Sequence, residues 1–569
     1  MTNPGRGRGG RREGLLREEE GGVRKEGRNL TRVCLAYPNR YETGMNNLGF
    51  LAVYRIFNDF PTVACERAFY PDPGEGGPSP PGSLPILSVE SQSPLRSFAV
   101  VAFSVSFEND YPRLVSMLLG SRIPPLREER REEDPLVMAG GIAATMNPEP
   151  LSDFVDLFLI GEAEASLPAF IARYLEARRA GMTKGELLED LQRHVRGVYV
   201  PSLYNPSYGP DGRLASFEPL KPDLPRKIKR PFLEDLDAAP AEQTILPRDA
   251  ALSGMYLTEV SRGCGRGCRF CAAGYHYRPP RFRGWDSVRA SLERGLAARG
   301  RIGLVGTAVS DHPHLERMGR FVLERGGRLA VGSLRVDALR EELVGLLARG
   351  GIETPALAPE AGSQELRDLI RKGIDDEGIM AAAAMLLRHG IVNLRLYFLI
   401  GLPTEGDGDA AAIADLARRI AGVTAGGRRF RRITLSVNPF VPKAGTPLQW
   451  YPLADAGETR RRIRALSSDL RREAVFALRC SSPREAYLQA LFSLGDRRVG
   501  GIILHYVRTG SWPRAFREAA VSPDFFVYRP KDPGEVLPWD FIDTGVPRAY
   551  LVGEYERTVA AGRDRKKTG

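Results

Sequence analysis

Short apolar segments alternate with amphipathic segments along most of the chain. The first series predicts strands at residues 33–37, 62–69, 98–106, 136–139 and 157–160, and helices at 48–58, at 111–119 and from about 165. Strands separated by helices of this length predict βαβ units and a parallel, doubly wound sheet. Ligands of such sheets bind at the carboxyl ends of the strands.

A second series follows a mixed, proline-rich stretch that includes "KPDLPRKIKRPF". It predicts six strands, at residues 255–260, 302–305, 328–333, 354–357, 393–400 and 433–438. Because a full eightfold (β/α) barrel takes roughly 250 residues, this shorter series favours a partial (β/α)6 barrel.

These patterns predict an α/β protein divided into consecutive parts. Residues 1–30 form a disordered arm, 31–180 a Rossmann-like domain, 181–250 a linker, 251–455 the partial barrel, and 456–569 a mostly helical region with a disordered basic tail. At 569 residues the chain is too long for one hydrophobic core, which supports the division.

The charge is concentrated at the two ends of the chain. The formal charge is +11, and residues 1–30 together with 562–569 supply +6 of it. The remainder is spread thinly, so nucleic acid is a disfavoured partner. No apolar run reaches the ~18 residues of a membrane span, and the first residues lack the apolar region of a signal peptide. We therefore expect a soluble, cytoplasmic protein.

Three of the six cysteines lie close together after the first strand of the second series. In "EVSRGCGRGCRFCAAGYHYRPP", Cys264, Cys268 and Cys271 have the spacing CxxxCxxC. Three thiolates on one loop can ligate three irons of a 4Fe-4S cluster and leave the fourth iron open. The alternative is a structural zinc site with His276 as the fourth ligand. For His276 itself, the role of an ordinary polar residue beside Tyr275 and Tyr277 is favoured over ligation.

This loop resembles the signature CxxxCxΦC of the radical S-adenosylmethionine (SAM) superfamily, with Phe270 at the aromatic position. The resemblance implies an enzyme with a barrel, a 4Fe-4S cluster and SAM, which the cluster cleaves to a 5′-deoxyadenosyl radical. That chemistry belongs to the cofactor, so no side chain is assigned a catalytic role. An electron donor such as flavodoxin or ferredoxin is also implied.

Later strands carry further segments of this kind. "LAPEAGSQELRDLIRKG" resembles the segment that lies near the SAM ribose, with Glu360 at the acidic position. "LYFLIGLPTE" resembles the segment that cradles the adenine, which implies Ile400, Gly401 and Pro403.

Two more segments are implied as SAM contacts. "GTAVSD" stands where the family has a GGE-type motif, which assigns Gly306, Thr307 and Ser310 to the SAM amino group. "SLRVD" places Ser333 and Arg335 on one face of a strand. Arg335 is predicted either to bind the SAM carboxylate or to form a salt bridge with Asp337 or a neighbouring helix.

The first domain resembles the cobalamin-binding domain that precedes many radical SAM barrels. The family pattern DxHxxG, SxL and GG corresponds to positions Asn39, Tyr41 and Gly44, then Ser104 and Ser106, then Gly140 and Gly141. Tyrosine replaces the histidine that ligates cobalt, and a phenol with a pKa near ~10 is a poor ligand. Either cobalamin binds without a histidine from the chain, or the domain has kept its fold and lost the corrinoid.

Three reactions remain open on an unknown small or macromolecular substrate. Cobalamin-dependent methyl transfer is favoured, and a cobalamin-free radical modification is the alternative. A methylthiotransferase would need three cysteines in the first domain, which has only Cys34 and Cys65, since Cys480 lies far along the chain. The contrasting class is a non-catalytic iron-sulfur or zinc binding protein.

Overall fold

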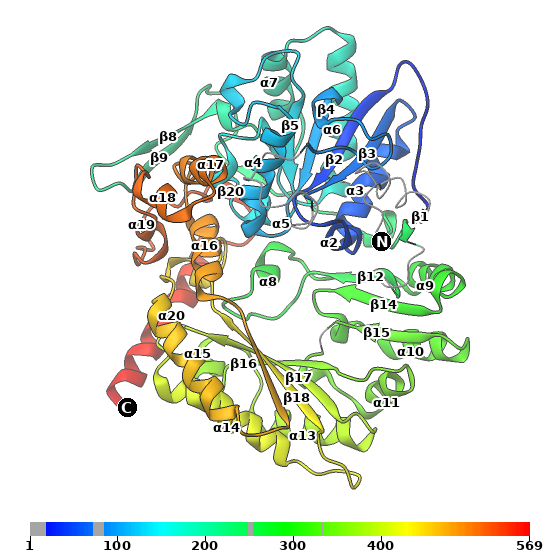
Figure 1. The fold of residues 1–569 in the computed structure, drawn as a ribbon, viewed down its shortest axis with the longest axis vertical. Helices are drawn as coiled ribbons and strands as arrows, with labels where there is room; N and C mark the ends of the chain where they lie inside the picture. Colours follow the sequence, from blue (N-terminus) through cyan, green and yellow to red (C-terminus); the bar gives the residue numbers. More distant parts are fainter. Residues whose placement is uncertain (1–18, 72–84, 248–253, 333, 569) are drawn as a thin grey trace, which may run out of the picture.

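Two α/β parts stand one above the other and are joined along a broad contact (Figure 1). The computed structural model describes residues 19–71, 85–247, 254–332 and 334–568. The upper part holds a six-stranded sheet, the lower part holds the barrel strands, and helices near the carboxyl end of the chain pack against both.

The upper sheet has the strand order β3-β2-β4-β5-β6-β7. Its strands are β2 (Thr31–Tyr37), β3 (Val63–Phe69), β4 (Val100–Ser104), β5 (Leu136–Gly140), β6 (Leu157–Leu159) and β7 (Val198–Tyr199). All neighbours are parallel except β6 and β7. The order reverses between β2 and β4, and such a switch point is where open α/β sheets bind ligands.

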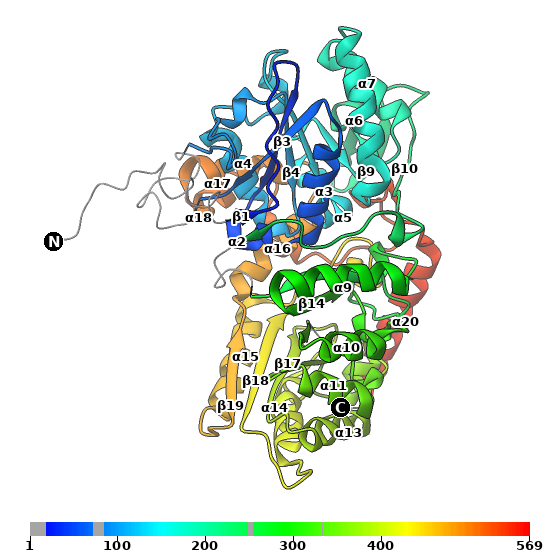
Figure 2. The ribbon, with the colours of Figure 1, turned by 90° about the vertical axis from the view of Figure 1, so that its right-hand side faces the viewer.

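Helices cover both faces of this sheet (Figure 2). α3 (Leu48–Asp59) and α6 (Ala163–Arg179) lie together on one face, and α4 (Tyr111–Gly120) lies on the other. Strand β3 is buried at all seven positions, as expected of a parallel strand covered on both sides. The predicted α/β class and doubly wound first sheet are confirmed.

Two segments are more ordered than the sequence suggests. The expected linker contains α7 (Lys184–His194), the edge strand β7 and the hairpin β8 (Tyr204–Tyr208) with β9 (Leu214–Pro219). In the expected disordered arm, residues 1–18 lie outside the described part. From Glu19 onward the chain packs on the first domain, because Arg67, fully buried in β3, pairs with Glu19 at 2.6 Å.

The lower part is an open barrel of parallel strands. β12 (Tyr256–Arg262), β14 (Arg301–Gly306) and β15 (Arg328–Val331) form one half; β16 (Ala356–Glu360), β17 (Asn393–Ile400), β18 (Arg432–Pro439) and β19 (Phe476–Cys480) form the other. A parallel bridge between Leu334 and Leu357 joins the halves. The six predicted strands are all present, and β19 is added beyond them.

Alternation along β17 explains how the barrel is built. Leu394, Leu396, Phe398 and Ile400 are buried in the core cluster beneath the surrounding helices, while the residues between them are half-buried. A period of two in a strand places these two sets on opposite faces. The half-buried set therefore faces the barrel interior.

The C-terminal region is mostly helical, as predicted, and belongs to both parts. α16 (Pro483–Leu494), α17 (Val499–Thr509) and α18 (Trp512–Arg517) contribute to the core of the first domain, where α17 packs on α4. The expected disordered tail is instead the end of a helix, α20 (Arg548–Thr568), because its first turns dock on the barrel side.

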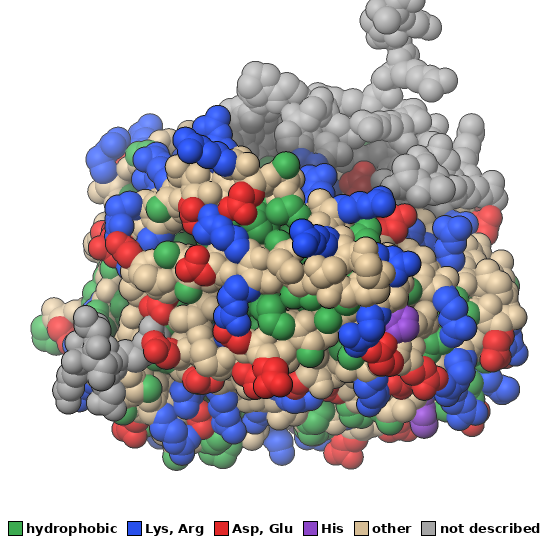
Figure 3. Space-filling model, turned by 90° about the horizontal axis from the view of Figure 1, so that it is seen from below, with side chains coloured by type: hydrophobic (Ala, Val, Ile, Leu, Met, Phe, Trp, Pro, Cys, Tyr) green, Lys and Arg blue, Asp and Glu red, His purple; other side chains and the backbone are tan. Residues whose placement is uncertain are grey.

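Charged side chains of both signs are interspersed on the face of the barrel seen in Figure 3. Across the described residues, no helix is both long and apolar enough to cross a bilayer.

Candidate functional site

The cysteine loop leaves the carboxyl end of β12 and ends in a short helix, α8 (Ala272–His276). Cys271 is the residue that caps this helix, and the backbone N–H of Arg266 donates to the Cys264 sulfur at 3.4 Å. Cys268 is buried, and the other two thiols are half-buried. The loop therefore lies at the strand end where parallel barrels place their chemistry.

All three thiols line one cavity of about 240 Å³. Four of the predicted SAM-binding residues line it as well: Phe270, Thr307, Arg335 and Glu360. These residues come from the cysteine loop and from the ends of three different strands. The sequence alone shows only the order of these segments along the chain, whereas the structure places the loop and the segments around one cavity.

Lys372 also lines this cavity, and the sequence analysis did not single it out. Its Nζ lies 3.0 Å from Glu360 Oε1 and 5.9 Å from the centre of the Phe270 ring. Burial raises the pKa of the Glu360 carboxyl, and Lys372 opposes that rise. Glu360 has a φ of 70°, a costly conformation for a side chain other than glycine. The available signal was the position of Lys372 at the end of the "LIRKG" segment.

Arg335 forms the salt bridge that was one of its two predicted roles. Its Nε lies 3.0 Å from Asp337 Oδ1, while it still lines the cavity. Asp337 also accepts from Arg266 at 2.7 Å, and Arg266 lies 3.2 Å from Asp311. These alternating charges tie the cysteine loop to the ends of the two neighbouring strands.

The other predicted SAM residues that the structure describes do not line this cavity. Ser310 is buried and accepts from the Arg335 backbone N–H at 3.4 Å. The carbonyl of Ile400 accepts from Phe440, and the Gly401 N–H donates to Glu405 at 2.7 Å. Pro403 follows in the same turn. Ser333 lies outside the described residues.

The structure does not bring His276 to the cysteines as a fourth ligand. Its Nε2 donates to the carbonyl of Ala444 at 2.8 Å, and its ring lines a different cavity. Burial lowers its pKa to about 4, so the imidazole is neutral.

That second cavity, of about 440 Å³, lies between the two parts of the molecule. From the upper sheet it is lined by Ser104, Ser106, Gly140 and Gly141, and from the barrel by Gly306 and Thr307. Thr307 lines both cavities, so the interdomain pocket adjoins the cysteine cavity. Gly141 has a φ of 100°, and a Cβ there would lie 2.5 Å from the Val105 carbonyl oxygen. Only glycine suits this turn.

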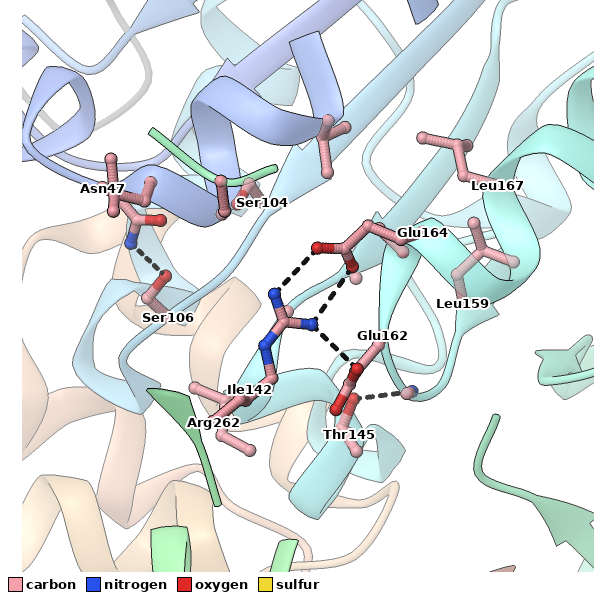
Figure 4. Close-up of a pocket in the computed structure, with 18 of the residues that line it drawn as sticks. Asn47, Ser104, Ser106, Ile142, Thr145, Leu159, Glu162, Glu164, Leu167 and Arg262 are labelled. Carbon is pink, nitrogen blue, oxygen red and sulfur yellow. Dashed lines mark hydrogen bonds and ion pairs between the residues drawn. The ribbon is translucent and has the colours of Figure 1, made fainter. Parts of the chain in front are cut away.

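Arg262 crosses between the two parts beside this pocket (Figure 4). From the end of β12 it reaches Glu162 and Glu164 at the start of α6, at 2.8 Å each, and Glu259 at 2.9 Å. Glu162 also pairs with Arg281 at 2.6 Å. Nothing in the sequence indicates this ion-pair network, because its residues in the first domain and in the barrel are about a hundred positions apart.

Three of the seven predicted cobalamin positions are absent from the pocket lining. Asn39 donates to Asp110 at 2.9 Å, and Tyr41 donates to Glu19 and packs edge-on against Phe69. A Cβ on Gly44 would lie 2.5 Å from the Phe69 ring, so this glycine serves close packing. Asn47, which caps α3 and donates to Ser106 at 3.0 Å, lines the pocket instead.

Cys34, Cys65 and Cys480 do not lie together in the structure, as a second cluster of the methylthiotransferase type would require. Cys34 and Cys65 are buried in the neighbouring strands β2 and β3, and burial raises the pKa of both thiols well above the ordinary value. Cys480 is exposed at the end of β19.

Sequence comparison identifies the family. Residues 258–417, which include the cysteine loop, match the Radical SAM superfamily, and residues 49–201 match the N-terminal region of radical SAM proteins. The chain carries a radical SAM domain. A relative is an uncharacterized protein of Methanocaldococcus jannaschii, 25% identical over 452 residues, which cover 78% of this chain and 85% of the relative.

Two solved structures are similar to this chain at low identity. The radical SAM methyltransferase TsrM from Kitasatospora setae, with cobalamin and a [4Fe-4S] cluster, is 14% identical, covers 72% of each chain and has a TM-score of 0.46. The cobalamin-dependent SAM radical enzyme OxsB, with aqua-cobalamin, is 14% identical, covers 95% of this chain and 81% of its own, and has a TM-score of 0.47.

Membership of this family implies a 4Fe-4S cluster and SAM, and the residues present fit both. Three thiols on one loop, all lining one cavity, are the soft donors that such a cluster requires. Burial raises the pKa of Cys271 to about 11, so ligation has to displace its proton. Lys372, Glu360 and Arg335 supply charged groups for a zwitterionic ligand in the same cavity.

Proposed function

We propose that this radical SAM enzyme binds cobalamin in the interdomain pocket and transfers a methyl group to its substrate. The observation that carries the proposal is the shared wall of the two cavities at Thr307. A cofactor or substrate in the interdomain pocket would lie next to the place where SAM is cleaved.

The lining of the pocket supports a cofactor that ends in an aromatic base. The pocket opens at the carboxyl ends of β4 and β5 and extends to Leu35, Val53 and Phe57, between the sheet and α3. Such an apolar slot suits an aromatic base, while Ser104 and Ser106 offer hydroxyl groups near its mouth. The histidine that lines the described pocket, His276, comes from the barrel and already donates to Ala444. Cobalamin would therefore bind without a histidine from the first domain.

The division of roles follows from the two cavities. When bound, the cluster and SAM supply a 5′-deoxyadenosyl radical, and cobalamin supplies a methyl carrier. The cysteine loop would hold the cluster, and Lys372 and Arg335 would orient the charged end of SAM. The ion-pair network around Arg262 would hold the two parts of the molecule together and exclude water from the pocket between them.

The first experiment tests the cluster. After anaerobic reconstitution, Cys268→Ala is expected to lose at least tenfold in 5′-deoxyadenosine formation with dithionite as reductant, and to bind less iron. Cys480→Ala removes an exposed thiol and should match the wild type. Unchanged 5′-deoxyadenosine in Cys268→Ala would refute the assignment of this loop.

The second experiment tests the corrinoid. Reconstituted protein is incubated with hydroxocobalamin, desalted, and its absorbance measured, and SAM labelled in the methyl group is then supplied. Ser104→Leu, which would fill the pocket, should retain at least tenfold less corrinoid, whereas Ser97→Leu, at an exposed position, should behave as the wild type.

A second candidate function is a cobalamin-free radical modification, with the substrate itself in the interdomain pocket. It is favoured by the pocket volume, which lies in the range of small-molecule sites. Wild-type protein that retains no corrinoid at micromolar concentration would replace the methyl-transfer proposal with this one.

A further inference from the structure

The C-terminal helix α20 reaches the cysteine loop through one buried carboxylate. Glu554 is 2% exposed, although glutamate is seldom fully buried without a partner. Its Oε2 lies 2.8 Å from the Nε of Arg269, the residue between Cys268 and Phe270. Arg269 is itself buried, so this pair is shielded from solvent at both ends. Figure 1 shows α20 running along the side of the barrel towards the lower part of the molecule.

Arg269 fixes the middle of the loop by two further contacts with the barrel. Its Nη1 donates to the Leu369 carbonyl at 2.6 Å, and its backbone N–H donates to the Ile370 carbonyl at 3.0 Å. Both carbonyls are at the end of α12 (Gln364–Leu369), which also contacts α20. The loop, α12 and α20 thus meet at one guanidinium.

Glu554 holds a second arginine that touches the same loop. Arg371 Nη1 lies 3.1 Å from Glu554 Oε1 and 3.3 Å from the Tyr550 hydroxyl. A Cβ on Gly267 would lie 3.0 Å from the Arg371 guanidinium, so that group lies flat against the loop one residue before Cys268. Arg557, one turn further along α20, completes the cations around this carboxylate.

We propose that Glu554 is a positioning residue for the cysteine loop, acting through Arg269 and Arg371 to hold Cys268 and Phe270 in place before the cluster arrives. The proposal rests on the assignment of this loop to the cluster. It gives the last helix of the chain a part in the radical chemistry that no motif in the sequence indicates.

Charge burial supplies the physical reason. Removal of one partner leaves the other as an uncompensated charge in a poorly solvated place, which is far more costly than loss of an exposed pair. In Glu554→Gln, Arg269 would have to move toward water, and the loop that carries it would move as well. The matched control is Glu556→Gln, which removes the same charge from an exposed position on the same helix.

The first readout is made on apo-protein and does not depend on the cluster. Alkylation rates of individual cysteines are measured by mass spectrometry with iodoacetamide. In Glu554→Gln, the buried Cys268 is expected to react at least tenfold faster, while Cys34 and Cys65, buried in the first domain, keep their rates. Unchanged Cys268 reactivity would overturn the proposal. An equal increase at all three cysteines would mean global unfolding and would overturn it too.

The second readout is made on reconstituted protein. Glu554→Gln should lose iron at least fivefold faster to a chelator, and its reduced cluster should show an altered electron paramagnetic resonance spectrum on addition of SAM. Glu554→Asp, which keeps the carboxylate, should recover part of both properties. The double variant Arg269→Gln/Glu554→Gln removes the buried unpaired charge and should be no worse than Glu554→Gln alone, because Arg371 and Arg557 remain partly exposed to water. Additive losses would argue against the proposal.

The two proposals fail separately. If wild-type protein takes up no cluster, the proposed function fails, and the alkylation result still decides whether Glu554 positions the loop. If the wild type is loaded normally and Glu554→Gln matches it in both readouts, only the present inference is wrong.

Discussion

Buried carboxylates in this molecule differ in what faces them. Glu162 and Glu554 each face arginines within 3 Å, whereas Glu405 accepts two backbone N–H groups, from Gly401 and Leu402, at 2.7 and 2.8 Å. Its nearest cation, Arg462, is 3.9 Å away. Burial therefore dominates and raises the pKa of Glu405 to about 7. This residue occupies the N–H groups of the very turn that resembles the adenine-binding segment.

Glu405 should make the stability of the apo-protein depend on pH. Between its ordinary pKa of about 4.5 and about 7, the folded state holds a proton that the unfolded state has lost. The free energy of unfolding should then fall as pH rises through this window, by up to about 3 kcal/mol. Gln has no carboxyl group to titrate. In Glu405→Gln, the contribution of this residue to the dependence of the unfolding free energy on pH should therefore disappear, as measured by urea unfolding at pH 5, 6, 7 and 8. Glu556→Gln should keep the wild-type slope, and a Glu405→Gln protein that keeps it too would contradict the assignment.

Among the elements, the short strand β1 (Glu19–Glu20) shows how a terminal arm is tied down. It pairs with β11 (Leu246–Pro247), and its Glu19 meets Arg67, which has Glu90 on its other side at 2.7 Å. The arm therefore neutralises a guanidinium in the core of the first sheet. This charge pair acts together with Val23, which packs against the core of the first domain and hydrogen-bonds to Tyr54.

We expect Glu19→Gln to destabilise the first domain by about 3 kcal/mol, because the buried Arg67 loses one of its two carboxylates. Glu26→Gln, exposed seven residues further along the arm, should change the free energy of unfolding by less than about 0.5 kcal/mol. The free energy of unfolding of each variant is measured by chemical denaturation, with hydrogen exchange in β3 as the probe. Equal, small effects of the two substitutions would show that the arm does not stabilise the sheet.

The sequence was informative where structure follows local periodicity. All six predicted barrel strands and the five predicted strands of the first sheet are present because short apolar runs between helices have few alternative structures. β7, β19 and α20 were not predicted from the sequence. The two strands lie at sheet edges and the helix is highly charged, and all three are stabilised by partners far away in the chain. The same holds for the site: the cysteines and Glu360 were found from spacing and motif, whereas Lys372, Arg262 and Glu554 are defined by long-range ion pairs.

At the scale of the whole molecule, the two parts are joined by charge on one side and by apolar packing on the other. Helices α16, α17 and α18 share the core of the first domain, although they follow the barrel in sequence. On the pocket side, Arg262 lies two residues before Cys264 and reaches Glu162 and Glu164 of the first domain. The chain thus returns to its first domain after the barrel, so that two sets of contacts join the two parts.

This arrangement predicts that Arg262 couples the interdomain contact to the cysteine loop. In Arg262→Gln, Glu164 loses the cation at 2.8 Å, whereas Glu162 retains Arg281, so the first turn of α6 should separate from the end of β12. Hydrogen exchange should rise together in peptides that cover 160–166 and 258–264, and 5′-deoxyadenosine formation should fall severalfold because the loop begins at that strand end. Arg289→Gln, at an exposed position on α9 (Trp285–Arg299), is the control. If exchange rises only in the peptide that covers 258–264, Arg262 stabilises only its own strand. An ion pair between the two parts would, when lost, also raise exchange in the peptide that covers 160–166.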